Sequence, residues 1–181
     1  MKKDFVMPIL VLSLICLIMS GALAVVRSIT QPVIEAAAVE RTDVAMREII
    51  PEADEFVLLE SKATELPKSV IEIYGTGNNT GYIFTVVSNS GYGGEIKLIC
   101  GIDPDGKIIK ITVLEHSETK GLGTNVFNKA GDYEGKDKNL EGIDAIAGAT
   151  ITSNAYKNAI LDAFSAFELV NVNVTEEVEE Q

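Results

Sequence analysis

The sequence predicts an α+β fold, in which a single N-terminal transmembrane helix precedes an extracytoplasmic domain with an antiparallel sheet and flanking helices. Three observations predict it. An uncharged apolar run occupies residues 5–26, strand-like segments follow one another between residues 56 and 114, and an amphipathic helical pattern occupies residues 153–169. Strands that are neighbours in sequence and are then followed by a helix are typical of an antiparallel sheet covered by helices.

The composition excludes several classes of function. The chain of 181 residues carries 15 basic and 27 acidic residues, and its net charge is −12. This charge argues against nucleic acid as a partner, because phosphate binding needs clustered Lys and Arg. Two cysteines and one histidine cannot build a four-cysteine iron–sulfur or zinc cage, nor a metal site of several histidines.

The apolar run at residues 5–26 is long enough to cross a membrane as a helix. It would span about 33 Å, against a hydrocarbon core of about 30 Å. Lys2 and Lys3 precede it, so the N-terminus is expected in the cytoplasm and the domain outside the cell (inner) membrane. The alternative is a cleaved signal peptide, since Ala22-Leu23-Ala24 resembles a cleavage site. The length of the run favours an uncleaved anchor over residues 1–27.

The rest of the chain is expected to form an arm region at residues 28–80, a main domain at 81–170 and a solvated acidic tail at 171–181. Pro32 is expected to open the arm helix, which Pro51 closes. Asp103-Pro104-Asp105-Gly106 predicts a hairpin turn, because Pro presets φ and Gly supplies a positive φ. Strands are predicted at 56–60, 70–74, 82–88, 94–102 and 107–114, with a short helix near 125–129. The final helix is expected to bury Tyr156, Ile160, Ala163, Phe164 and Phe167.

The segment that carries chemistry is DAIAGATITS, from Asp144 to Ser153. It places small residues and hydroxyls in a tight turn directly before an amphipathic helix. Gly148 and Ala149 leave the backbone open to close approach by a ligand. The free N–H groups at the start of a helix favour an anion, phosphate above all. An ordinary helix start, with Thr152 or Ser153 as the N-cap, is the alternative.

This segment resembles the flavinylation motif of the FMN-binding domain family, D-x-x-[SA]-G-A-[ST]-x-[ST]. Residues 116–123, HSETKGLG, resemble the family's H-x-E-T-P-G-L-G loop, with Lys120 where proline is usual. Residues 91–96, GYGGEI, resemble its G-Y-x-G-x-I strand start. The resemblance covers roughly residues 81–170 and implies covalent FMN, joined through a phosphoester bond to Thr152. The residues that match the other fixed positions of the motif are Asp144, Gly148, Ala149 and Thr150.

The resemblance also implies how neighbouring residues serve the flavin. Tyr92 and Leu122 are expected to form apolar walls for the isoalloxazine ring, and Glu118 and Thr119 to form hydrogen bonds to its edge. Gly121 and Gly123 are expected to allow close backbone approach, and Ser153 to start a helix beside the phosphate. His116, the only histidine, either fixes the loop by a hydrogen bond or moves a proton. Cys100 is expected to be a small buried residue of a strand.

A threonine hydroxyl is a poor nucleophile without an adjacent base. No residue at a fixed spacing from Thr152 supplies an obvious base, so attachment is expected to need a separate protein. The resemblance implies a flavin transferase that uses FAD and Mg²⁺. Once attached, the flavin carries the electrons, and the protein holds and tunes it.

One anchor and one such domain in a short chain resemble the G subunits of Rnf complexes, which couple electron transfer between ferredoxin and NAD to ion movement across a membrane. The resemblance implies an electron-transfer protein that is not catalytic alone. Its expected partners are other membrane subunits, especially a second flavin-bearing one. Two alternatives stay open: the C subunit of the sodium-pumping NADH:quinone oxidoreductase, and an anchored extracytoplasmic binding or sensory module without a redox role.

Overall fold

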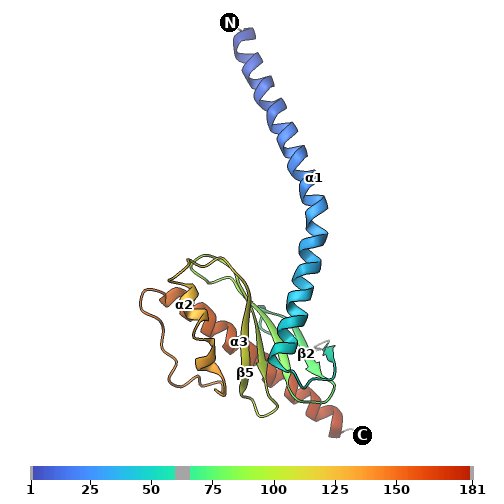
Figure 1. The fold of residues 1–181 in the computed structure, drawn as a ribbon, viewed down its shortest axis with the longest axis vertical. Coiled ribbons are helices and arrows are strands. Elements are labelled where there is room, and N and C mark those ends of the chain that lie inside the picture. The colour runs from blue at the N-terminus through green and yellow to red at the C-terminus, as the bar shows by residue number, and fades with distance from the viewer. Residues whose placement is uncertain (1, 60–65, 180–181) are drawn as a thin grey trace. The chain divides into compact units, whose positions relative to one another are not determined.

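The computed structural model describes residues 2–59 and 66–179, with the backbone alone for residues 2–5 and 172–179. The chain separates into two compact units, residues 1–42 and residues 43–181 (Figure 1). The described residues of the first unit are helical, and the second unit holds a β-sheet with its covering helices. The α+β class with an antiparallel sheet is therefore confirmed.

Helix α1 runs without a break from Lys2 to Ile49, through Pro8 and Pro32. The expected helix start at Pro32 is therefore wrong. Proline fixes φ near the helical value, so an interior proline costs one hydrogen bond and some strain but does not force a helix to end. The turns before Pro32 gain other bonds, because the Ser28 and Thr30 hydroxyls donate to backbone carbonyls at 2.8 and 3.0 Å.

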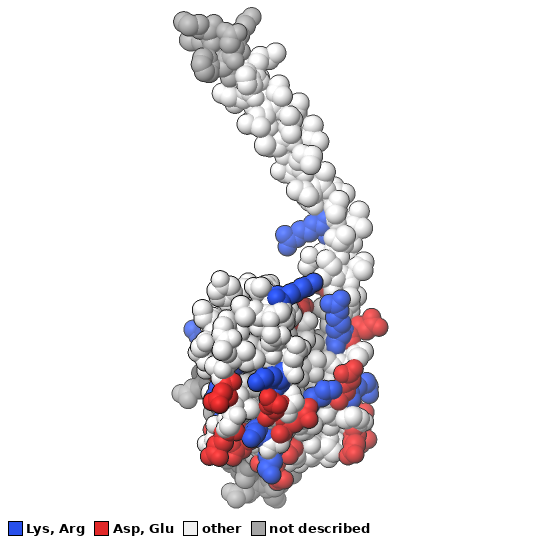
Figure 2. All heavy atoms as spheres, turned by 60° about the vertical axis from the view of Figure 1, so that its left-hand side comes forward, with Lys and Arg blue, Asp and Glu red and all other residues white. Residues whose placement is uncertain are grey.

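The first part of α1 has the surface of a membrane anchor. No charged residue lies between Val6 and Val26, and the space-filling view shows this stretch as a rod without charged side chains (Figure 2). Its large apolar side chains are exposed, as lipid-facing side chains are. The helix is long and apolar enough to cross a membrane.

The sheet has five antiparallel strands in the order β1-β2-β3-β4-β5, so each strand pairs with its neighbours in sequence. The predicted end of the first strand, residue 60, lies outside the described residues. Gly94 has a φ of +120°, which fits a turn and not a strand, so β4 begins two residues later than expected. The predicted hairpin is present, with Gly106 at a φ of +78°. The strands are β1 (Phe56–Leu58), β2 (Val70–Thr76), β3 (Tyr82–Ser88), β4 (Ile96–Ile102) and β5 (Ile108–His116).

Alternation along the strands gives the sheet two apolar faces. One face packs against helix α3 (Thr150–Glu179), and Phe84, Leu98 and Cys100 lie in that core. The other face carries Ile83 and Ile99, which pack against the last turn of α1. Gly101 makes this approach possible, since a Cβ there would lie 2.2 Å from Cγ2 of Ile49.

Helix α3 differs from its prediction at both ends. It begins at Thr150 instead of Ser153, and it continues to Glu179 through the segment predicted as a tail. Glutamate is a good helix former and no Gly or Pro interrupts the sequence there, so the helix has no local reason to stop. The predicted buried side chains are confirmed: Tyr156, Ile160, Ala163, Phe164 and Phe167. The predicted short helix is α2 (Thr124–Phe127), and η1 (Ala130–Tyr133), a 3₁₀ turn, was not predicted.

Candidate functional site

The start of α3 is set by the turn before it. Gly148 has a φ of +82°, a conformation that suits glycine. The carbonyl of Ala149 accepts a 2.9 Å bond from the Ser153 N–H, which makes Ala149 the N-cap. The expectation that Thr152 or Ser153 caps the helix is therefore wrong. Ser153 has another task, because its hydroxyl accepts a 3.0 Å bond from the Ile146 N–H. Thr152 consequently lies inside the first turn.

Thr152 faces the loop that follows β5. Its hydroxyl donates a 2.9 Å hydrogen bond to the Oε2 atom of Glu118. Both residues are buried, Thr152 with 1% of its surface exposed and Glu118 with 6%. A carboxyl group buried beside a hydroxyl has the arrangement of a nucleophile and its base. Sequence reasoning found no carboxyl group at a fixed spacing from Thr152, and the structure places one within hydrogen-bonding distance, from 34 residues earlier in the chain.

Glu118 is held by groups other than Thr152. Its Oε1 atom accepts a 3.2 Å bond from the Gly93 N–H. Its own N–H donates to Nδ1 of His116 at 3.2 Å, so His116 makes the loop-fixing hydrogen bond that was one of its two expected roles. Glycines give the carboxyl group its space. A Cβ at Gly91 or Gly123 would lie 2.6 Å from an oxygen of Glu118.

The loop between Glu118 and α2 closes on itself by backbone and hydroxyl bonds. Gly121, at a φ of +77°, donates from its N–H to the Thr124 hydroxyl at 2.9 Å. Its carbonyl accepts a 2.6 Å bond from the Asn125 side chain. The carbonyl of Thr119 accepts bonds from two N–H groups further along, while the side chain is exposed. These bonds shape the loop although Lys120 replaces the usual proline.

Three large apolar side chains are exposed around this cluster. Tyr92 is 70% exposed, and its neighbours in sequence, Gly91 and Gly93, both lie beside Glu118. Leu122 is 46% exposed, and its Cδ1 would lie 3.3 Å from a Cβ at Gly148. Ile151, beside Thr152 in α3, is 54% exposed. Sequence reasoning named Tyr92 and Leu122 but not Ile151, because Ile151 occupies a position at which the motif specifies no residue type.

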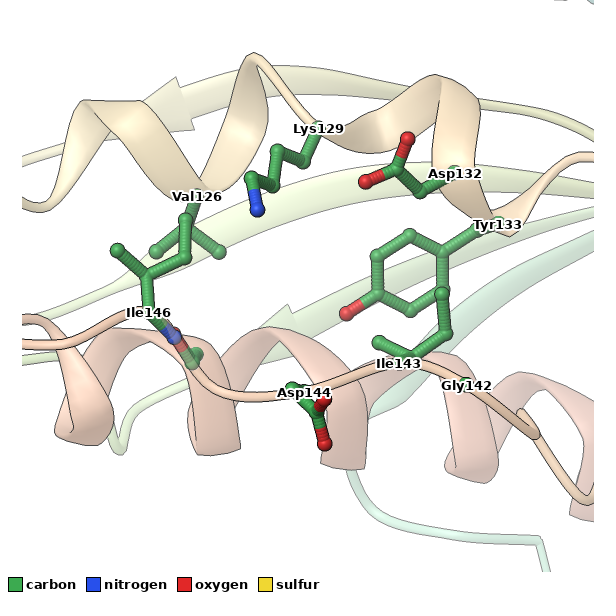
Figure 3. Close-up of a pocket in the computed structure, with 9 residues that line it drawn as sticks. Val126, Lys129, Asp132, Tyr133, Gly142, Ile143, Asp144 and Ile146 are labelled. Atoms are coloured by element: carbon green, nitrogen blue, oxygen red, sulfur yellow. The ribbon is translucent and has the colours of Figure 1, made fainter.

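A pocket of about 130 Å³ lies behind the motif (Figure 3). Tyr133 and Lys129 face it from the α2–η1 side, opposite the loop that carries Asp144. Burial, with a contribution from the charge of Asp132, raises the pKa of Tyr133 to about 12, so its phenol is protonated at neutral pH. The lining residues are Val126, Lys129, Asp132, Tyr133, Gly142, Ile143, Asp144, Ile146 and Ser153.

The expected site residues thus fall into two groups. Thr152, Glu118 and Gly123 come together around one carboxyl group. Asp144 and Ser153 line the pocket instead. Of the other expected residues, Ala149 is buried, and the exposed ones are Tyr92, Thr119, Gly121, Leu122, Gly148 and Thr150. Sequence reasoning missed Gly93 as a contact of Glu118, and the α2–η1 side of the pocket.

The fold and site define a class of protein, an FMN-binding domain carried on an N-terminal apolar helix. The family profile described as the FMN-binding domain matches residues 91–165, which include Gly93, Glu118 and Thr152. The match covers 75 of the 181 residues of the chain.

Relatives similar over most of the chain specify the family further. The G subunit of the proton-translocating ferredoxin:NAD(+) oxidoreductase complex of Clostridium ljungdahlii is 31% identical over 164 residues, which cover 84% of this chain and 85% of that protein. The G subunit of the Na(+)-translocating ferredoxin:NAD(+) oxidoreductase complex of Acetobacterium woodii is 30% identical over 177 residues, covering 83% and 86%. The G subunit of the ion-translocating oxidoreductase complex of Methanosarcina acetivorans is 29% identical over 180 residues, which cover 90% of this chain and 94% of that protein.

The chain belongs to the family of G subunits of ion-translocating oxidoreductase complexes. This confirms the resemblance to the G subunits of Rnf complexes. The names of the first two relatives specify different coupling ions, a proton and Na⁺.

Proposed function

We propose that this chain is the membrane-anchored electron carrier of an ion-translocating ferredoxin:NAD(+) oxidoreductase complex, and that it carries FMN through a phosphoester bond on Thr152. The observation that carries the proposal is the Thr152 hydroxyl, which sits in the first turn of α3 and is bonded to a buried carboxyl group. It lies within the residues that match the FMN-binding domain. FMN, when bound, supplies one- and two-electron chemistry that no side chain offers.

The residues around Thr152 fit such a group. A phosphodiester carries one negative charge, which the free N–H groups and dipole of the first turn of α3 favour. Exposed apolar side chains offer surface to an aromatic ring, since Tyr92, Leu122 and Ile151 would otherwise be left in water. The turn at Gly148 and Ala149, followed by Thr150, brings backbone and not bulky side chains beside the attachment point. In the loop that follows Glu118, Thr119 and Gly121 are exposed, and Gly123 packs against the Glu118 carboxyl group.

The anchor suggests why a covalent bond is useful. Lys2 and Lys3 precede the apolar run, so the positive-inside rule favours an N-terminus in the cytoplasm and a flavin domain on the other side. A domain that faces the exterior cannot recover lost FMN from a dilute medium. The proposed partners are the other membrane subunits, especially a second flavin-bearing one, and a flavin transferase that uses FAD and Mg²⁺.

The sidedness is tested by adding a protease to spheroplasts that hold the full-length chain. Loss of the domain from intact spheroplasts supports an extracytoplasmic domain. Protection until the membrane is broken contradicts it.

The attachment is tested by flavin fluorescence in a denaturing gel, after co-expression of the full-length chain with a flavin transferase. The wild-type band is expected to fluoresce and the Thr152→Val band to stay dark. Thr150→Val and Ser153→Ala are the matched controls, because they remove neighbouring hydroxyls of the same helix turn, and both are expected to fluoresce. A dark wild-type band, beside a bright control substrate of the same transferase, contradicts the proposal.

A further inference from the structure

We propose that Glu118 is the base that accepts the proton of Thr152 when the flavin is attached, so that the acceptor protein supplies part of the chemistry of its own modification. This inference rests on the proposed attachment at Thr152. It assigns to Glu118 a role different from the hydrogen bond to the ring edge expected from the sequence.

The first argument is the unusual partner of the Thr152 hydroxyl. A helical Ser or Thr commonly returns its hydroxyl proton to the carbonyl four residues earlier. Thr30, Thr42 and Ser165 do so in the described part of the chain, bonding Val26, Ala38 and Leu161 at 3.0 Å. Thr152 lies in the first turn of α3, where the carbonyl four residues earlier precedes the helix, and its hydroxyl donates to a side chain 34 residues away. Its proton therefore already points at the group that would receive it.

The second argument is the fixed orientation of the carboxyl group. Oε1 is held by the Gly93 N–H at 3.2 Å, which leaves Oε2 directed at Thr152 at 2.9 Å. A base within hydrogen-bonding reach of the nucleophile and oriented by a third group is the arrangement that activates a hydroxyl. Both residues are buried, so water does not compete for the proton.

The step balances without an oxidant or reductant. Thr152 Oγ1 attacks the phosphorus on the riboflavin side of a flavin dinucleotide, and its proton passes to Oε2 of Glu118. The new bond joins Oγ1 to phosphorus, the bond to the bridging oxygen of the diphosphate breaks, and AMP leaves. Glu118 is then protonated and can donate a hydrogen bond to the phosphodiester. A carboxylate within hydrogen-bonding distance of the attachment atom would otherwise repel the phosphodiester.

Access to the buried hydroxyl requires a neighbouring segment to move. Glu118 itself cannot easily move, because it follows the end of β5 by two residues and is hydrogen-bonded to His116 and Gly93. Gly121 and Gly148 have positive φ angles and are exposed, and Leu122 lies against Gly148. The turns at Gly121 and Gly148 are therefore better suited to move than Glu118.

The test measures initial rates of covalent flavin formation on the full-length chain in detergent, with purified transferase, FAD and Mg²⁺. In Glu118→Gln an amide oxygen can still accept the hydrogen bond but cannot take the proton. We expect kcat to fall about 100-fold or more, and KM for the protein to stay within about threefold. Glu115→Gln, at an exposed position three residues earlier, is the matched control and should label like the wild type.

Two further variants separate a base from a structural support. Glu118→Asp keeps the carboxyl group but withdraws it by one methylene, and should lower kcat by about 10- to 100-fold. Glu118→Ala leaves space for added formate, which should restore labelling in proportion to its concentration, whereas chloride should not. No formate effect is expected for Thr152→Val.

The outcomes distinguish this inference from the proposed function. An unlabelled wild type contradicts the attachment itself. A labelled wild type beside a Glu118→Gln variant that labels at a similar or higher rate overturns the role of Glu118 and leaves Thr152 in place. If circular dichroism shows that Glu118→Gln is unfolded, Glu118→Ala decides, because labelling of that variant at the wild-type rate without formate excludes Glu118 as the base.

Discussion

The Thr152 hydroxyl lies 2.9 Å from the Glu118 carboxyl group, and this one bond joins two sequence motifs that lie 34 residues apart. A third motif meets the same carboxyl group, since the Gly93 N–H donates to its other oxygen. Gly123 packs so closely on Glu118 that a side chain there would overlap it. The three motifs are therefore the parts of one site, held together by a single buried side chain.

Gly123→Ala should disturb this site without straining the backbone. Gly123 has a φ of −63°, which any residue adopts, but its Cβ would lie 2.6 Å from Oε2 and 2.9 Å from Cβ of Glu118. We expect a loss of about 1–3 kcal/mol in the free energy of unfolding and slower flavin labelling. Gly131→Ala, where a Cβ meets nothing within 4 Å, is the control for thermal and denaturant unfolding. Equal stability of the two variants would contradict the close packing of Gly123 on Glu118.

Gly101→Ala should weaken the contact between the sheet and the last turn of α1. The new Cβ would lie 2.2 Å from Cγ2 of Ile49, and we expect a loss of about 1–3 kcal/mol. Ile49→Ala alone should cost about 2–4 kcal/mol, because it removes a fully packed side chain. The loss in the free energy of unfolding of the double variant should be smaller, by about 1 kcal/mol, than the sum of the two single losses. Strict additivity in denaturant unfolding would show that the two residues do not compete for space.

Tyr156→Phe should stabilise the protein, and more so at high pH. Among the described residues, the buried Tyr156 hydroxyl has no hydrogen-bond partner, so its removal should be neutral or worth up to about 1–2 kcal/mol at pH 7. Burial raises the pKa of Tyr156 above its usual 10.0. Stability from the protonated phenol is thus complete below pH 10 and is lost as pH rises towards the folded value, because the unfolded chain releases its proton first.

The measurement for Tyr156→Phe is urea unfolding between pH 7 and pH 11. The fall in stability of the variant should be shallower by up to about 1.4 kcal/mol per pH unit. Tyr133 and Cys100, whose pKa values burial raises to about 12, act in the same direction and remain in both proteins. Tyr92→Phe, at a 70% exposed position, should match the wild type. A steeper alkaline loss in Tyr156→Phe than in the wild type would contradict the assignment.

Cys100 should not react with alkylating agents in the folded protein. It is fully buried, and burial raises the pKa of its thiol from 9.0 to about 12. At pH 8 the thiolate fraction is therefore on the order of 10⁻⁴, and the thiolate is the reactive form. In a Cys16→Ser background, iodoacetamide should label the native chain very slowly and the denatured chain fully. Native labelling at the rate of a free cysteine would show that strand β4 is open.

Much of the fold follows from local sequence. The strand at residues 82–88 was predicted to the residue, because an apolar segment between two turn signals leaves few choices. The Asp103–Gly106 turn follows from the φ preferences of Pro and Gly. The helix through Pro32 could not be predicted, because an interior proline usually ends or kinks a helix, although its φ is close to the helical value. The continuation of α3 to Glu179 was missed because acidic composition indicates solvation and does not exclude a helix.

The residues of the candidate site were named from the sequence, but their arrangement was not. Resemblance to a family brought Glu118, Gly123 and Thr152 into one list, but no periodicity relates positions 34 residues apart. Their contact depends on tertiary packing, which brings the end of β5 to the start of α3. The separation of Asp144 and Ser153 into the neighbouring pocket has the same origin. The bond from Ile146 that removes Ser153 from a capping role is local, but it follows no simple sequence pattern.

The most direct measurement is mass spectrometry of peptides from the full-length chain, purified after co-expression with a flavin transferase. The account predicts one peptide with an added FMN group, with fragment ions that place the mass on Thr152 and leave Thr150 and Ser153 unmodified. An unmodified Thr152 peptide, in a preparation where a control substrate of the transferase is fully labelled, would contradict the account. FMN on Thr150 or Ser153 would contradict it equally.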